Sequence, residues 1–104
     1  MQATRAELAA AEARARTIRN EQSLRLQAAH RKLTRAVAAA TVLRGEVLPR
    51  AESVLQGAEA RYRAGDMSLT ELLPLRRDWT RVRLDYLEAL YDVMQAWAEL
   101  SPYL

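Results

Sequence analysis

Ser68 and Glu71 form the polar pair whose types and spacing carry the clearest chemistry in this chain. A serine followed three residues later by a glutamate is the signature of a capping box, in which hydroxyl and carboxylate accept hydrogen bonds from backbone N–H groups at the start of a helix. Gly65 can adopt the left-handed conformation that closes a preceding helix, and two arginines in the last turn before it suit the negative end of the helix dipole. We therefore predict a tight turn over residues 65–68 between two helices.

The other polar residues lack the arrangements that catalysis requires. The sequence has no glycine-rich phosphate loop and no nucleophile elbow, and its carboxylates are scattered. It contains no cysteine, which excludes a disulfide framework and a thiolate metal site. His30 is the single histidine, and because no second ligand lies three or four residues away, we interpret it as a surface side chain. We expect a protein that is not an enzyme and that uses no cofactor or metal.

The aromatic residues and the charge distribution raise nucleic-acid binding as an alternative. Trp79, Tyr86 and Trp97 resemble a stacking platform for bases, but their helical spacing favours a core or an interface. Residues 1–50 carry ten Lys/Arg against four Asp/Glu, and residues 51–104 carry six against nine. A basic half can attract nucleic acid. Because the arginines alternate with Ala, Gln and Glu, however, we interpret them as a solvated helix face and expect no nucleic-acid partner.

The first 62 residues repeat apolar or small side chains every three or four positions. This spacing predicts a long helix over about residues 3–64 with one apolar stripe. At 1.5 Å per residue it would span on the order of 90 Å, so other helices must cover the stripe. Pro49 removes a backbone hydrogen bond, and because we expect the stripe to keep its phase there, we predict a kink near Pro49 rather than a break. The stripe comprises Leu8, Ala11, Ala15, Ile18, Gln22, Leu26, Ala29, Leu33, Ala36, Ala40, Leu43, Val47, Ala51, Val54, Ala58 and Tyr62.

A second helix is predicted over about residues 69–100, where apolar residues follow a seven-residue repeat. It is about half as long as the first, which leaves residues 1 to about 30 without a partner in the chain. A further apolar line leads us to expect that this helix is covered on more than one side. The repeat comprises Leu72, Trp79, Tyr86, Val93 and Leu100 with Leu75, Val82, Ala89 and Ala96, and the further line comprises Leu73, Leu87, Leu90, Met94 and Trp97.

Together these patterns predict an all-α fold: a long antiparallel, coiled-coil-like helical hairpin that forms a single domain over residues 1–104. No run of about 18 apolar residues would form a membrane-spanning helix. The first residues lack the apolar region of a signal peptide, so we expect that in an exported protein this chain would be an internal piece.

The run from Ala60 to Leu73, ARYRAGDMSLTELL, resembles the Tyr-x-x-Gly-x-x-Ser/Thr-x-x-Asp/Glu-Leu-Leu motif of the TolC-like outer-membrane efflux proteins. The flanking segments are similar to the same family. Residues 43–51 resemble its leucine-proline segment, and residues 83–90 and 96–100 resemble its downstream helix, most closely in the heavy-metal CzcC/CusC branch. The likeness covers essentially the whole chain.

The resemblance implies a periplasmic hairpin of a trimeric outer-membrane channel, in which helices continue a membrane barrel as a tunnel. It implies two partners, a periplasmic adaptor (membrane fusion protein) and an inner-membrane pump of the RND type, with heavy metals as candidate substrates. Glu71 would lie at the tunnel entrance, and Pro74 stands where the family often has a second carboxylate. The adaptor-docking tip would comprise Tyr62, Gly65, Asp66, Met67 and Ser68.

A free-standing coiled-coil adaptor or scaffold protein is the alternative to this efflux function. In either case the isolated chain would expose long apolar seams, and each buried Leu, Val or Trp contributes roughly 1.5–3 kcal/mol. We therefore expect self-association into an antiparallel bundle in which the unpaired N-terminal halves overlap.

Overall fold

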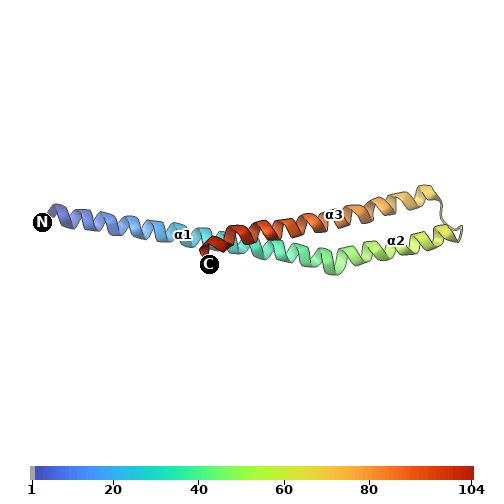
Figure 1. Cartoon of the computed structure of the whole chain (residues 1–104), viewed down its shortest axis with the longest axis horizontal. Helices are drawn as coiled ribbons and strands as arrows, with labels where there is room; N and C mark the ends of the chain where they lie inside the picture. The colour runs from blue at the N-terminus through green and yellow to red at the C-terminus, as the bar shows by residue number, and fades with distance from the viewer. Residues whose placement is uncertain (1) are drawn as a thin grey trace.

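Two antiparallel helical arms joined by a short turn make up the computed structural model, which describes residues 2–104 (Figure 1). The long arm comprises α1 (Gln2–Val42), the π-helical segment η1 (Leu43–Val47) and α2 (Leu48–Arg63). The short arm comprises α3 (Leu69–Leu100) and the 3-10 turn η2 (Ser101–Tyr103). These residues contain no strand and extend over 94 × 20 × 14 Å. The predicted all-α hairpin is confirmed; Met1, part of the predicted 1–104 domain, lies outside the described residues.

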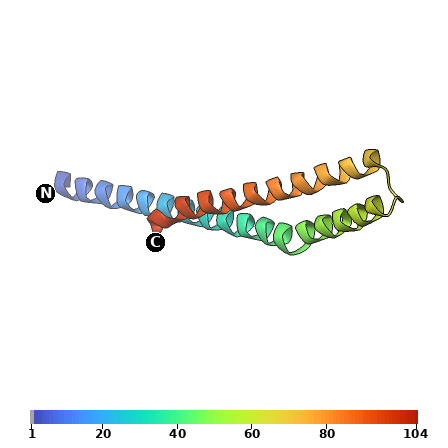
Figure 2. The ribbon, with the colours of Figure 1, turned by 45° about the vertical axis from the view of Figure 1, so that its right-hand side comes forward.

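The short arm covers only part of the long arm, as Figures 1 and 2 both show. Near its C-terminal end, Leu100 lines a groove together with Leu26 of α1. Six residues further along α1, Lys32 Nζ lies 2.8 and 2.9 Å from the two carboxylate oxygens of Glu99. All residues from 4 to 25 are exposed. The expectation of an N-terminal segment without an intrachain partner is confirmed, with its limit at Leu26.

The face of α3 that packs on the long arm is the predicted seven-residue repeat. All of its positions are buried or half-buried, and Ala96 has an exposed fraction of 0%. A repeat of 3.5 residues keeps these side chains turned toward a partner helix over many turns, with a slight supercoil. The further apolar line, in contrast, is exposed, so within this chain α3 is not covered on a second side.

The predicted apolar stripe of the long arm is buried or half-buried from Leu26 to Leu43, and beyond Leu43 the packed residues depart from the prediction. Beyond η1 the inward-facing residues include Leu48 and Leu55, whereas the predicted Val47 and Val54 face solvent. Leu55 is 7% exposed and Val54 is 56% exposed. The predicted Tyr62 is exposed as well, although Ala51 and Ala58 remain in the stripe. The prediction that the stripe keeps its phase is therefore wrong.

The π-helical segment η1 explains the change of phase. The N–H of Leu48 bonds to the carbonyl of Leu43, five residues earlier, so this turn holds one more residue than an α-helical turn. Pro49 follows directly; it lacks an N–H, and in a regular α-helix its ring would clash with the carbonyl of Gly45. The wider turn accommodates the proline, and the arm changes direction there in both views (Figures 1 and 2). A kink near Pro49 is confirmed, and its structural basis is a π-helical turn.

Candidate functional site

The tip of the hairpin (residues 62–71) begins with a Schellman motif at the end of α2. The N–H of Asp66 donates to the carbonyl of Arg61 at 2.8 Å, and the N–H of Gly65 donates to the carbonyl of Tyr62 at 3.1 Å. Gly65 has a φ of 83°, which within residues 2–104 is the single positive value. A side chain with a Cβ is disfavoured in this conformation. The predicted glycine-closed helix end is confirmed.

Ser68 caps α3 on the other side of the turn. Its backbone is extended (φ −79°, ψ 160°), and its Oγ accepts a hydrogen bond from the N–H of Glu71 at 3.2 Å. The Glu71 carboxylate oxygen Oε1 accepts a hydrogen bond from the Ser68 hydroxyl, with 3.1 Å between the two oxygens, whereas in a full capping box the carboxylate would accept from the Ser68 N–H. The serine cap is confirmed and the reciprocal half of the box is wrong. This contact holds the carboxylate at the positive end of the α3 dipole.

A small apolar cluster lies between the two arms next to the turn. Leu55 and Ala58 of α2 and Leu72 of α3 are buried, and Met67 packs against them while it remains half-buried. Met67 therefore anchors the turn to the arms. The sequence around Met67 did not indicate this packing, because the cluster forms only when residues of both arms come together.

The structure brings all six predicted site residues together at one end of the molecule (Figure 1). Apart from Met67 they are exposed, and Tyr62 lies on α2 with 42% of its surface exposed. The arrangement provides hydrogen-bonding groups and one aromatic side chain on a turn that is held by caps at both ends. Such a surface can bind another protein, and the docking role of these residues stays a prediction.

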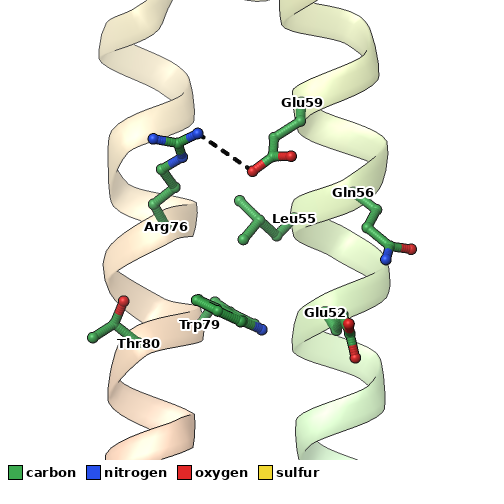
Figure 3. Close-up of a pocket in the computed structure, with 7 residues that line it drawn as sticks. All are labelled: Glu52, Leu55, Gln56, Glu59, Arg76, Trp79 and Thr80. Atoms are coloured by element: carbon green, nitrogen blue, oxygen red, sulfur yellow. Dashed lines mark ion pairs between the residues drawn. The ribbon is translucent and has the colours of Figure 1, made fainter.

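A hollow of about 380 Å³ lies between α2 and α3, next to the apolar cluster (Figure 3). Arg76 Nη2 lies 3.5 Å from Glu59 Oε1 and bridges the two helices at one end of the hollow. The Trp79 ring projects between the helices, and the guanidinium carbon of Arg83 lies 4.7 Å from its centroid. Sequence analysis did not identify this hollow, because its lining comes from two arms whose register is set by packing. Its lining residues are Glu52, Leu55, Gln56, Glu59, Arg76, Trp79 and Thr80.

The other residues considered for chemistry lie apart from the tip. His30 is exposed on α1, as expected, and lines an apolar groove beside Leu100. Trp79 and Tyr86 are half-buried in the seam between the arms, whereas Trp97 is mostly exposed. Within residues 2–104 no group of three or more His, Asp or Glu side chains is placed to hold a metal ion. None of the described helices combines the length and the apolar character needed to cross a membrane.

Comparisons of the chain with protein-family models, with curated proteins and with solved structures give no match. The likeness of residues 60–73 to the efflux motif therefore stays a prediction.

Proposed function

We propose that this chain is a wall segment of an α-helical tunnel in the periplasmic part of a trimeric outer-membrane efflux channel. The observation that carries the proposal is the second apolar face of α3. Leu87, Met94 and Trp97 are large, apolar and more than half exposed, although the opposite face of the same helix is already packed on the long arm. A helix with two apolar faces suits a wall in which each helix has a neighbour on either side.

The tip supports the same function. Caps on both helices and the Met67 anchor define the conformation of the turn without help from a partner. A preorganised surface loses less conformational entropy when it docks, which favours binding to a periplasmic adaptor. Tyr62, Asp66 and Ser68 provide exposed groups for such contacts.

The mechanism of such a segment is passive. The helices enclose a water-filled path, and small changes of packing near the tip open or close it, with energy supplied by an inner-membrane pump. In a trimer three copies of Glu71 would form a ring of carboxylates at the entrance and attract cations. Glu71→Gln in the full-length channel is expected to weaken block by cations in single-channel recording, and unchanged block would leave Glu71 with its capping role alone.

Complementation of a strain that lacks the parent gene tests the proposal. The parent gene should restore export, and Asp66→Arg should abolish export while the protein still reaches the outer membrane, since the substitution reverses a charge on the exposed turn. Asp78→Arg is the matched control, because it makes the same change at an exposed position of α3 away from the tip. If the strain that lacks the gene accumulates no more antibiotic or metal than the strain that carries it, the efflux function is contradicted.

A free-standing scaffold protein is the second candidate, and the exposed N-terminal segment favours it. Residues 4–25 extend beyond the hairpin as a helix that is accessible on all sides and suited to coiled-coil pairing. Cell fractionation separates the two functions, because a channel segment sediments with the outer membrane as a trimer and a scaffold does not.

A further inference from the structure

An exposed apolar row runs along the outer side of α3. We call Leu84, Leu87, Tyr91 and Met94 the outer stripe; their exposed fractions lie between 57% and 69%. Steps of three, four and three residues keep the four side chains on one helix face. At roughly 100° per residue this face points away from the buried Ala89 and Ala96. Within the part of the chain that the structure describes, nothing covers the outer stripe.

The N-terminal segment carries a row with the same spacing. Leu8, Ala11, Ala15 and Ile18, which we call the N-terminal stripe, also follow steps of three, four and three, and all four are exposed. Each residue number differs by 76 from that of its counterpart in the outer stripe. In this register Ala11 faces Leu87 and Ala15 faces Tyr91. At these two central positions large side chains meet small ones, which allows the helices to approach closely, and at the two ends Leu8 faces Leu84 and Ile18 faces Met94.

The two segments also differ in charge. Residues 4–25 contain five arginines and three glutamates, for a net charge of +2. Residues 80–101, which face residues 4–25 in this register, contain four aspartates and glutamates and two arginines, for a net charge of −2. Opposite potentials of this kind favour association and select orientation and register.

The N-terminal segment cannot reach the outer stripe of its own chain. Leu100 at the end of α3 lies beside Leu26, and α3 runs from there toward the tip, whereas residues 4–25 continue away from it (Figures 1 and 2). Ala11 is fifteen residues from Leu26, so at 1.5 Å per residue it lies roughly 20 Å before the hairpin begins. Leu87 lies thirteen residues from Leu100 in the opposite direction, which makes the axial separation roughly 40 Å.

We propose that the outer stripe is a docking site for the N-terminal stripe of a second copy of this chain, in an antiparallel two-fold dimer. A two-fold axis near Leu100 places the N-terminal segment of each copy along α3 of the other, so both stripes of both copies are covered at once. The contact is isologous and closed, which limits the assembly to two chains. The dimer covers Leu87 and Met94, which in the proposed tunnel wall would pack on a neighbouring helix, so the dimer and the wall are alternative assemblies of this chain. In the dimer, contacts between unlike segments replace an overlap of the N-terminal segments with each other.

Cysteine cross-linking tests the register, because the chain has no cysteine of its own. Ala11→Cys/Leu87→Cys introduces two exposed thiols that face each other only across the dimer. We expect oxidation to give a covalent dimer, with residues 11 and 87 joined in the digested protein. Ala11→Cys/Met94→Cys is the matched control, since it moves one thiol along the same stripe by roughly 10 Å and should cross-link at least tenfold more slowly. Equal rates for the two variants overturn the register.

The single variant Ala11→Cys tests whether the N-terminal segment of one copy pairs with α3 of the other copy or with the other N-terminal segment. We expect it to stay uncross-linked under the same conditions, because residue 11 of each copy lies on the other copy's α3. Efficient cross-linking through residue 11 alone means that the N-terminal segments pair with each other, and that result overturns the proposal.

Charge reversal tests the complementarity in the full chain. Arg16→Glu/Arg19→Glu should raise the dimer Kd by about tenfold or more, because each substitution acts at both symmetric contacts. Adding Glu88→Lys/Asp92→Lys should restore most of the affinity, because in this register Asp92 lies at the level of Arg16 and Glu88 lies one turn before it. Arg44→Glu/Arg50→Glu changes the net charge equally at exposed positions outside both segments and should leave Kd within a factor of about two. Sedimentation velocity over a concentration series measures Kd; a monomer at all concentrations, or equal weakening by the control, contradicts the proposal.

Discussion

The tip and the N-terminal segment are both helical, but different interactions hold them in that conformation. At the tip, caps on both helices and a buried cluster act within one chain. Residues 4–25 have only their own helix hydrogen bonds, with every side chain exposed. Most helical stability in proteins comes from packing an apolar face, and residues 4–25 pack no such face within the chain. Within the chain, packing therefore stabilises the hairpin and not the N-terminal segment, which in the proposed dimer would pack on the second copy.

Hydrogen exchange gives the largest expected difference between the two regions. At a dilution where the chain is monomeric, amides of residues 4–25 should exchange faster than those of residues 72–96 by roughly two orders of magnitude or more, because local opening costs little where nothing is packed. Mass spectrometry of peptides from both regions measures the ratio. Equal exchange rates of the two regions in the monomer would contradict the conclusion that only the hairpin is stabilised by packing within the chain.

Leu72→Ala should remove much of the stability of the tip. Leu72 is 3% exposed and packs with Leu55 and Ala58, so its truncation should lower the free energy of unfolding by about 2–3 kcal/mol. Leu24→Ala is the control, because Leu24 is exposed in the N-terminal segment and its loss leaves no cavity. Urea unfolding followed by circular dichroism compares them; similar losses would mean that the two regions are supported alike.

Two glycine substitutions of the same kind should act in opposite directions. Gly65→Ala should destabilise the hairpin by about 1 kcal/mol, since a Cβ is disfavoured at φ 83°. Gly57→Ala lies inside α2, and beyond its chain neighbours and the nearby helix backbone no atom lies within 4 Å of the new Cβ, so it should stabilise the helix by about 0.5–1 kcal/mol. Thermal melting of both variants tests whether one substitution lowers the melting temperature and the other raises it. An unchanged melting temperature for Gly65→Ala would contradict the role of Gly65 in closing α2.

Removing one hydroxyl from each region should distinguish a cap from a helix-interior hydrogen bond. Ser68→Ala should cost about 1 kcal/mol, because the N–H of Glu71 loses its side-chain acceptor. In Thr17 the hydroxyl donates to the carbonyl of Ala13 inside α1, and Thr17→Ala should leave stability unchanged or slightly improved. Chemical unfolding of the two variants provides the measurement, and a loss at Thr17 as large as at Ser68 would contradict the contrast.

The smallest expected effect lies at the boundary between the two regions. Lys32 and Glu99 form an exposed ion pair where α3 begins to cover α1. Lys32→Ala should cost no more than about 0.5–1 kcal/mol at low salt, and the difference from the parent should vanish in concentrated salt. Unfolding at two ionic strengths checks this. A loss of unfolding free energy that is the same at both ionic strengths would show that the aliphatic part of the Lys32 side chain contributes by packing.

The sequence was sufficient to predict the parts of this protein that depend on neighbours in the chain. Gly65 and Ser68 act through hydrogen bonds to residues at most five positions away, and these local preferences do not need a partner helix. The seven-residue repeat of α3 was also predicted in full, because a regular α-helix without an irregular turn preserves the spacing of its sequence pattern.

The tertiary structure decided the features that depend on both arms. The π-helical turn before Pro49 made Leu55 rather than Val54 the inward residue, since one extra residue in a turn rotates everything that follows relative to α3. The anchoring of Met67 and the pairing of Arg76 with Glu59 depend on that rotation as well. The sequence pattern of one helix does not say how that helix is rotated about its axis relative to a second helix. That rotation depends on how the side chains of the two helices pack together.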